Sequence, residues 1–557
     1  MKTKLLLIVL LMSIAMASFG QVYPRYEKIN EKSGETIVNE LKAFAEMNGL
    51  PELVIDLLVR NHYDVEAYRV IYKTEAANPY KEKVWASGVV FVPKGMDHPA
   101  PMATYLHGTI GSEGEAPSQV AAETGGSNGT LIEDQTLFGW VLATDGYIAV
   151  LPDYIGLGDE DIGDNFHPFM HARSEASATI DMLYAVRKVL TDINIPFQKR
   201  IFLSGYSQGG HAVLAAQREI ESRKTHSAEF DIAISVPASG AYCLSSIQRK
   251  FLVNNPDYTN PGHLPYLVFG YKEAYGMRFY PDLTKVFEKE PETIKALYDQ
   301  QLNIEEIDRE LEMIHPGLLS NWKIMFTNEF REDFENNWCF WRCPPIIRAL
   351  RDNDVVDWKP RAKTRMIFCF GDEVVAPENT LAAYLIFLSV HNAEDVIPIS
   401  LGINEHTACA IPSLVLTKFL FDANLGWKSK LDKSEIEYRE LDKDDALQAL
   451  NRIGIYTMEE LKMEVLAEST AIPEEVKEGL KAVEVYPNPA NDHIYVEMPT
   501  FKPGIRMTIY DITGRAVGSK DLNNRVTRMD ITGLDSGIYL VRLNYNGAEY
   551  IRKLIKH

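Results

Sequence analysis

Short runs of apolar residues alternate with helix-like segments between Val84 and Asp422. An unbroken apolar run is typical of a strand buried on both faces of a sheet, whereas apolar residues that recur every three or four positions are typical of a helix with one buried face. Strands are predicted at residues 84–92, 102–106, 146–151, 200–203, 230–236, 365–370 and 396–401. Helices are predicted around residues 180–190, 211–220 and 410–421. The alternation indicates βαβ units and therefore an α/β fold with a mostly parallel sheet.

A long insertion interrupts this alternation between residue 248 and about residue 363. The segment is mostly polar and aromatic, and its pattern predicts helices at residues 284–298 and 304–314. Because strands are predicted on both sides of it, the insertion must leave the sheet and return. We expect a helical lid over a site, and a plain helical decoration is the alternative.

The N-terminus has the pattern of a secretory signal peptide. Lys2 and Lys4 precede an apolar stretch, and small residues lead to an expected cut before Gln21. The apolar stretch is short for a membrane span, which disfavours an anchor. We therefore expect residues 1–20 to be a signal peptide, followed by an α/β domain at residues 21–430.

Two further segments follow that domain. Residues 431–482 are charged and helix-rich in pattern, and we expect a helical connector there. From residue 483 to residue 557, short β-type alternations are separated by turn signals, including Thr513-Gly514 and Asn546-Gly547. This pattern predicts a small C-terminal all-β sandwich.

Composition excludes several classes of protein. The 557 residues are 46% hydrophobic and 24% charged, which excludes a wholly disordered or coiled-coil chain. The formal net charge of −21 disfavours nucleic-acid binding and attraction to anionic membrane surfaces.

The five cysteines are too few for a disulfide scaffold, and their odd number leaves at least one free or paired outside the chain. Cys339 and Cys343 are the only pair close in sequence, and they either bridge or remain two buried thiols. No spacing indicates zinc. The acidic loop at residues 159–164 is interpreted as a solvent-exposed loop rather than a calcium site. We expect neither a metal nor an organic cofactor.

Residues 205–209 have the sequence GYSQG, between a predicted strand and a predicted helix. Glycines at these positions allow a sharp turn that leaves the serine hydroxyl exposed at the end of the strand. An ordinary strand-to-helix turn is the alternative. The context favours Ser207 as a nucleophile.

A serine nucleophile needs a histidine base and an acid that orients it, in the chain order serine, acid, histidine. Asp372 follows the strand at 365–370 and is the first choice for the acid, with Glu373 as the second. His406 follows the last predicted strand, where the base belongs, and the other histidines beyond Asp372 lie on helical or β-module positions. The predicted triad is Ser207, Asp372 and His406.

The oxyanion of such a reaction needs two backbone donors. One is the amide of Gln208, directly after the nucleophile, and the second is expected at Thr109, after an earlier strand and a glycine. We expect His107 to shape this loop and His211 to lie on the helix beneath the turn.

With these motifs, the region from about residue 80 to residue 424 resembles the α/β-hydrolases, and most closely the secretory lipase family and related bacterial carboxylesterases. The motifs are YLHGT (105–109), PDYIGLG (152–158), SEA (174–176), GYSQGGH (205–211), DW (357–358), DEVV (372–375) and HTACA (406–410). The resemblance implies hydrolysis of carboxylic esters through an acyl-serine intermediate and a helical lid within the insertion. In the family a proline directly follows the valine after the acid, whereas Ala376 intervenes here, so Glu373 stays open as the acid.

The C-terminal module resembles the sorting domain of the type IX secretion system of Bacteroidetes. Its motifs are VYPNPA (485–490), YDITGR (510–515), LDSGIYLVRL (534–543) and KLIK (553–556). This resemblance implies interaction with the secretion machinery and export to the surface or the medium. A carbohydrate-binding sandwich is the alternative for the module.

The sequence therefore predicts a secreted serine esterase or lipase that acts on a small ester or lipid. A secreted serine peptidase of the same fold and a binding protein on a hydrolase scaffold are the alternatives. The aromatic residues of the insertion either suit apolar acyl chains or form the insertion's own core. These residues are Phe334, Trp338, Phe340 and Trp341.

Overall fold

A computed structural model describes most of the α/β region and most of the C-terminal module. The described residues are 24–47, 53–78, 80, 82–122, 134–159, 163, 165–299, 302–335, 343–425, 439–440, 484–486, 490–497, 505–510, 516–522, 524–534, 537–545 and 548–556. They divide into two compact units, one with the described residues up to 331 and from 349 to 440, the other with 332–348 and those from 484 onward. The predicted signal peptide lies outside the described residues, and so does the predicted connector except for residues 439–440, which form a strand. The predicted domain boundaries stay predictions.

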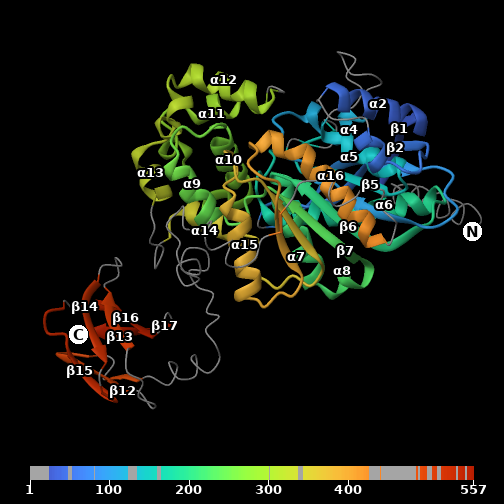
Figure 1. Cartoon of the computed structure of the whole chain (residues 1–557). Coiled ribbons are helices and arrows are strands. Elements are labelled where there is room, and N and C mark those ends of the chain that lie inside the picture. The colour runs from blue at the N-terminus through green and yellow to red at the C-terminus, as the bar shows by residue number, and fades with distance from the viewer. Residues whose placement is uncertain are drawn as a thin grey trace, which may run out of the picture. The chain divides into compact units, whose positions relative to one another are not determined.

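A ten-stranded sheet forms the centre of the first unit (Figure 1). Its order is β1-β2-β3-β5-β4-β6-β7-β8-β9-β10, with parallel pairing from β5 through β4, β6, β7 and β8 to β9. The strands are β1 (Arg25–Lys32), β2 (Val65–Glu75), β3 (Lys83–Pro93), β4 (Ala100–Thr104), β5 (Ile148–Tyr154), β6 (Phe197–Tyr206), β7 (Asp231–Ala238), β8 (Thr364–Phe368), β9 (Val396–Ser400) and β10 (Arg439–Glu440). Each strand predicted here is present within a few residues. The sequence pattern did not reveal β1 and β2, which extend the antiparallel edge.

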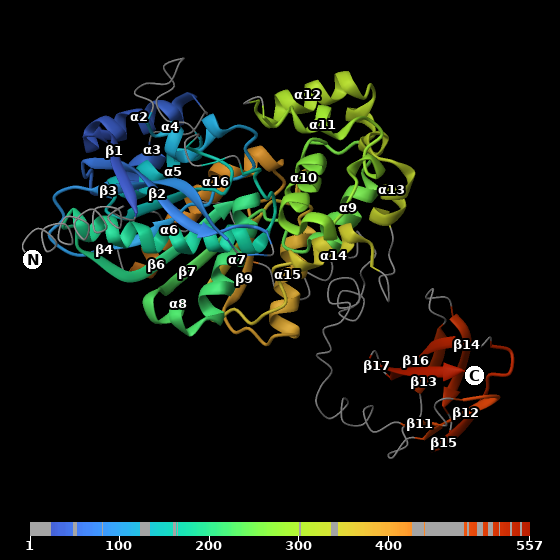
Figure 2. The same ribbon diagram turned by 180° about the vertical axis from the view of Figure 1, so that it is seen from behind.

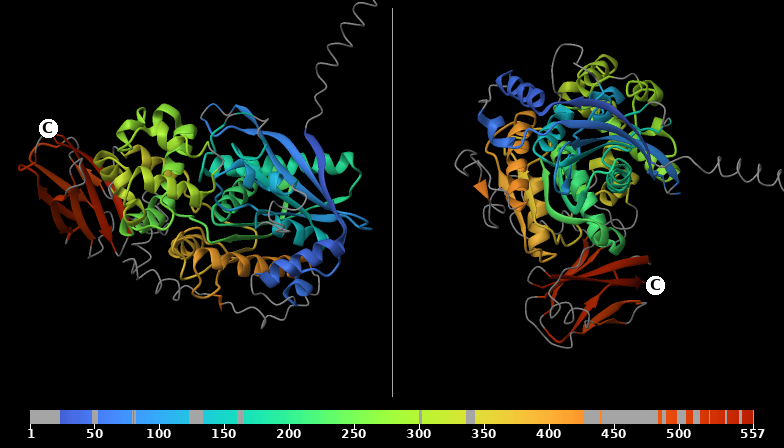
Figure 3. Two further views of the ribbon diagram at one scale, coloured as in Figure 1. Left: turned by 90° about the horizontal axis from the view of Figure 1, so that it is seen from above. Right: turned by 90° about the vertical axis from the view of Figure 1, so that its right-hand side faces the viewer.

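Helices cover both faces of this sheet (Figure 2). Successive strand residues alternate between two cores, as Val89 and Val90 do in β3, which explains the unbroken apolar runs. One core contains α2 (Gly34–Met47), α3 (Leu53–Leu58), α5 (Asp134–Thr144) and α16 (His406–Leu425); the other contains α6 (Ala172–Asp192) and α7 (Gln208–Ser222). In the right-hand view of Figure 3, the blue α2 and the orange α16 lie on the same side of the sheet.

Helix α16 is long and apolar enough to pass a length-and-composition test for a membrane span. Its residues Leu416 and Phe421 are fully buried against the sheet, so the core explains its apolar character. At its centre the buried Lys418 ammonium contacts Asp145 at 2.6 Å and Asp422 at 2.8 Å. Helix α16 is therefore a helix packed into the core of this fold.

The insertion between β7 and β8 is helical, as the pattern predicts. Its elements are α9 (Arg249–Asn254), α10 (His263–Tyr275), α11 (Pro291–Lys295), α12 (Ile304–Ile314), α13 (Asn328–Glu335) and α14 (Pro345–Asp352), with shorter turns at Leu244–Gln248, Gly276–Arg278, Leu283–Lys285, Leu318–Ser320 and Trp322–Met325. Helix α12 matches its predicted range. The single helix predicted at 284–298 is wrong, because Pro291 occupies the first turn of α11 and cannot continue a preceding helix.

The C-terminal module consists of two antiparallel sheets around its own apolar core. One sheet contains β11 (Glu484–Tyr486), β12 (His493–Glu497) and β15 (Val526–Asp530). The other contains β14 (Ala516–Leu522), β13 (Ile505–Tyr510), β16 (Gly537–Tyr545) and β17 (Ala548–Lys556). This arrangement agrees with the predicted all-β module.

Candidate active site

Ser207 occupies the sharp turn between β6 and α7. Its backbone has φ 58° and ψ −120°, a conformation that costs energy in a residue with a side chain. The turn is held because the Ser207 amide donates to the Ala238 carbonyl at 3.0 Å. A Cβ atom on Gly209 would lie 1.8 Å from the Leu106 carbonyl oxygen, and one on Gly205 would lie 2.5 Å from the Gly209 carbonyl oxygen. Only glycine fits at these two positions, which accounts for the GYSQG pattern.

The imidazole of His406 lies between the other two predicted triad members. Its Nε2 is 2.9 Å from Ser207 Oγ, and its Nδ1 is 2.7 Å from Asp372 Oδ2. A carboxylate accepts but does not donate, so Nδ1 carries the proton and Nε2 accepts from the serine hydroxyl. The structure thus brings together three residues that are distant in the sequence, at hydrogen-bond distances.

Asp372 and Glu373 both contact His406, but at different groups. Asp372 Oδ1 accepts from the amides of Val374 at 3.1 Å and Val375 at 2.8 Å, which leaves Oδ2 for the ring. Glu373 accepts from the backbone amide of His406 at 3.0 Å. Glu373 therefore caps the first turn of α16, a contact that the sequence analysis, which kept Glu373 as the second choice for the acid, did not anticipate.

The two predicted oxyanion donors lie beside this turn. Leu106 forms a parallel bridge with Gly205, so the chain after β4 passes close to Ser207. A Cβ atom on Gly108 would lie 3.5 Å from Ser207 Cβ, which places this loop against the serine. Among the described residues, no acceptor is found for the backbone amides of Gln208 and Thr109. Gln208 also begins α7, where the helix dipole favours negative charge.

A buried polar network lies beneath the turn. The carboxylate of Glu175 accepts from Gln208 Nε2 at 3.1 Å and from His211 Nδ1 at 2.6 Å. The other ring nitrogen of His211 lies 2.8 Å from the carbonyl oxygen of Asn353. Gln208 Nε2 also donates to His167 Nε2 at 2.9 Å, and burial lowers the pKa of His167 to about 3, so this ring is neutral and accepts. The Gln208 side chain is turned away from the site, which leaves its backbone amide as the group beside Ser207.

The sequence analysis placed His211 beneath the turn but did not identify this network. The available signal was Glu175, a carboxylate on the buried face of a helix, since buried acidic residues usually have a specific partner. His107 shapes the loop before Thr109: its ring nitrogens face the carbonyls of Gly108 at 2.7 Å and Asp153 at 3.3 Å. Burial lowers the pKa of His107 to about 4.

Residues of the insertion lie close to the base. Tyr258 and His263 are hydrogen-bonded at 3.1 Å; Tyr258 is buried and His263 is half-buried. Burial lowers the pKa of His263 to about 3, and repulsion from His406 adds to this effect. The start of α10 is therefore near enough to His406 for the two rings to interact electrostatically.

The aromatic residues of α10 pack mainly against aromatic residues of neighbouring segments. Tyr266 stacks on Phe169 and on Tyr298, with ring centroids 4.9 Å apart in each case. Phe334 is also buried, whereas Trp338, Phe340 and Trp341 lie outside the described residues.

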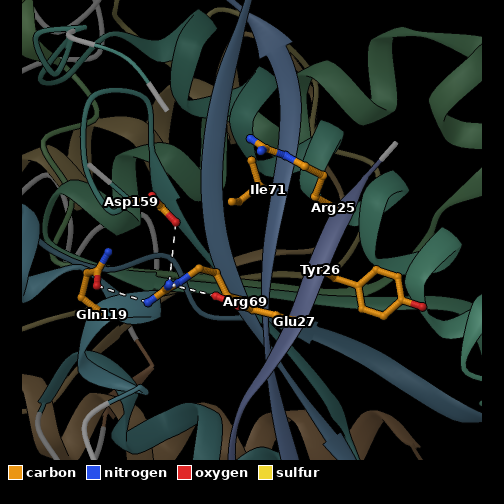
Figure 4. Close-up of a pocket in the computed structure, with 7 residues that line it drawn as sticks. All are labelled: Arg25, Tyr26, Glu27, Arg69, Ile71, Gln119 and Asp159. Atoms are coloured by element: carbon orange, nitrogen blue, oxygen red, sulfur yellow. Dashed lines mark hydrogen bonds and ion pairs between the residues drawn. The ribbon is translucent and has the colours of Figure 1, made fainter. Parts of the chain in front are cut away.

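An open depression of about 510 Å³ lies elsewhere, over β1 and β2 (Figure 4). Its Arg69 guanidinium contacts Glu27 at 3.1 Å, Gln119 at 3.2 Å and Asp159 at 3.7 Å. The order of the sheet separates β2 from β6, which leads to Ser207, by three strands. The depression thus contains none of the residues at the candidate active site.

No cluster of metal-ligand residues is present in the part of the chain that the structure describes. Most of the acidic loop at 159–164 lies outside that part. Of the cysteines, Cys369 and Cys409 form a disulfide, which the sequence analysis did not predict, and Cys243 is free and buried. Cys343 is disulfide-bonded as well, and Cys339, its predicted partner, lies outside the described residues.

Comparison with known proteins agrees with this geometry. Residues 125–223, which include Ser207, match the model of the secretory lipase family, and residues 484–557 match that of the secretion system C-terminal sorting domain. A search among curated proteins found no match.

Several solved structures share the fold. The rice cell wall degrading esterase LipA from Xanthomonas oryzae is 25% identical, with a TM-score of 0.57 over 72% of this chain and 96% of that chain. A Legionella pneumophila protein is 20% identical, with a TM-score of 0.58 over 73% of this chain and 99% of that chain, and this likeness concerns the fold alone. The chain thus has an α/β-hydrolase fold in which one segment matches the model of the secretory lipase family, and its C-terminal residues match that of a secretion sorting domain.

Proposed function

We propose that this protein is a secreted serine hydrolase that cleaves carboxylic esters. The observation that supports the proposal most directly is the position of the His406 ring, 2.9 Å from Ser207 Oγ and 2.7 Å from Asp372 Oδ2. The match to the secretory lipase family and the esterase with the same fold support esters as the substrate class.

In the first half of the reaction, Ser207 Oγ attacks the ester carbonyl carbon while His406 Nε2 takes the hydroxyl proton. Asp372 keeps the other ring nitrogen protonated and stabilises the imidazolium. The amides of Gln208 and Thr109 donate to the carbonyl oxygen as it becomes negatively charged. The C–O bond to the alcohol then breaks, and the departing oxygen takes the proton from His406.

In the second half, water attacks the acyl-serine. His406 removes a proton from the water, the same two amides stabilise the second oxyanion, and the acid is released as Ser207 Oγ regains its proton. These steps use only side chains and backbone amides of this chain.

The proposal includes export by two signals. The predicted signal peptide at residues 1–20 would deliver the chain across the inner membrane, and the C-terminal sorting domain supports delivery by the type IX secretion machinery. The destination is the cell surface or the medium.

The test compares the wild type with Ser207→Ala on p-nitrophenyl esters of graded acyl length and on aminoacyl-anilides. We expect the variant to lose about 10⁵- to 10⁶-fold in kcat on esters, because triad members act as a unit. The chain-length optimum then separates an esterase from a lipase. Turnover of anilides instead of esters would indicate a peptidase. If the protein shows no turnover of either substrate and Ser207 is not labelled by a fluorophosphonate, the binding-protein alternative remains.

A further inference from the structure

A disulfide joins the segment that carries the acid to the helix that carries the base. Cys369 directly follows β8, three residues before Asp372, and Cys409 lies in the first turn of α16, three residues after His406. The disulfide and the His406–Asp372 hydrogen bond therefore connect the same two segments. In each segment, only two residues lie between the cysteine and the residue of the hydrogen bond.

On each side of the disulfide, a short turn of the chain joins the cysteine to the neighbouring site residue. The Asp372 amide donates to the Cys369 carbonyl at 3.4 Å, so a tight turn joins the cysteine to the acid. His406 and Cys409, three residues apart in a helix, are neighbours on its surface, so a shift of one moves the other. Both cysteines are completely buried, which places the sulfur bridge inside the core.

The remaining connections at the start of α16 are hydrogen bonds. Glu373 accepts from the His406 amide at 3.0 Å, and the Tyr206 hydroxyl donates to the His406 carbonyl at 2.6 Å. The loop before the helix adds little packing, because Ile403 is 87% exposed. A base that must face both Ser207 and Asp372 needs placement within about 0.5 Å. The disulfide supplies a covalent link where the loop has little apolar burial.

We propose that Cys369 and Cys409 are positioning residues: their disulfide holds His406 in register with Asp372, so that hydrolysis is efficient only in the oxidised protein. This inference rests on the proposed function. It connects the site with export, because the bond forms in oxidising compartments and a reduced chain inside the cell would be nearly inactive.

The change of state is a two-electron step that an added dithiol can reverse. One thiolate of the reagent attacks a sulfur of the bridge, and the S–S electron pair leaves on the other cysteine, which takes a proton. The reagent then closes its own disulfide and releases the second cysteine as a thiol. The dithiol is oxidised, and the protein gains two thiols.

The main experiment compares Cys369→Ala/Cys409→Ala with Cys339→Ala/Cys343→Ala, a matched control that removes the cysteines of the insertion. Both are assayed with the wild type and Ser207→Ala for kcat, KM, fluorophosphonate labelling rate and thermal unfolding, well below the unfolding temperature. We expect the first variant to lose about 10- to 100-fold in kcat and in labelling rate, with KM nearly unchanged, since a misplaced base impairs chemistry more than binding. The control should remain within about twofold of the wild type.

A merely structural bond would lower the unfolding temperature and leave kcat within about twofold of the control, and that result would overturn the inference. It would not affect the proposed function, which stands as long as the wild type hydrolyses esters and Ser207→Ala does not. A wild type without ester turnover or Ser207 labelling would overturn both.

Should the first variant fail to fold, the control variant is reduced with dithiothreitol while circular dichroism follows its fold. Activity should fall as two further thiols become titratable beside Cys243, and it should return on reoxidation. Full activity after both thiols have appeared would contradict the proposal.

Discussion

The exchange of Asp372 for asparagine tests the orientation of His406 most directly. In the structure, Asp372 Oδ1 accepts from two backbone amides, of Val374 and Val375, and Oδ2 faces His406 Nδ1 at 2.7 Å. An asparagine must place its single oxygen toward the two amides, because its NH₂ group cannot accept from them. The NH₂ group then faces Nδ1.

This replacement reverses the tautomer of His406. Nδ1 must accept from the asparagine, so the proton moves to Nε2, which then cannot take the proton of Ser207. We expect kcat to fall about 10⁴-fold, as for the equivalent change in other serine hydrolases, which corresponds to about 5.4 kcal/mol of transition-state stabilisation. The fold should be retained, since the shape of the side chain is the same.

Glu373→Gln is the matched control on the neighbouring carboxylate. A glutamine oxygen still accepts from the His406 amide, and only the favourable charge at the start of α16 is lost, at a cost of about 1 kcal/mol or less. We expect an activity within about fivefold of the wild type. The assay is kcat/KM on a soluble p-nitrophenyl ester, with active sites counted by fluorophosphonate labelling. Asp372→Asn within about tenfold of the wild type, or a larger loss in Glu373→Gln, would refute this assignment of the acid.

Two further predictions concern buried charge. Lys418→Met leaves the carboxylates of Asp145 and Asp422 without their shared ammonium, and we expect it to lower the free energy of unfolding in urea by about 3–5 kcal/mol. The control Lys188→Met, at an exposed ion pair, should lower it by less than about 1 kcal/mol. Equal losses in the two variants would contradict this reasoning. Burial raises the pKa of Asp308 from 3.8 to about 7, so between these pH values the folded state keeps a proton that the unfolded state loses. The stabilisation from this proton is fully present below pH 4 and should be lost as the pH rises to 7. The free energy of unfolding should fall by at most about 4 kcal/mol over this range. Asp308→Asn should remove this pH dependence from the unfolding temperature, and an unchanged profile would refute the assignment.

The sequence alone was sufficient for most of the parallel sheet. Strands buried on both faces are unbroken apolar runs, and β3 to β9 have this local signature. The edge strands β1 and β2 lack it, since polar residues such as Arg69 and Lys73 interrupt them. The place of β2 in the sheet depends on its pairing with β3, and that of β1 on its pairing with β2, which no local pattern reveals.

At the site, the sequence determined the candidates through their order along the chain. Ser207 follows β6, Asp372 follows β8 and His406 follows β9, and the ends of parallel strands meet at one edge of the sheet. The GYSQG pattern is likewise local, because steric limits within one turn require its glycines.

Only the tertiary structure decided the contacts between distant segments. It directs Asp372 to the ring of His406 and Glu373 to its backbone amide, joins Cys369 to Cys409, and buries Glu175 between Gln208 and His211. Adjacent carboxylates are equivalent in sequence, and cysteines forty residues apart have no local signature. The sequence by itself determines which strands and turns form, because those depend on neighbouring residues, whereas side-chain partners depend on how the strands and helices pack in three dimensions.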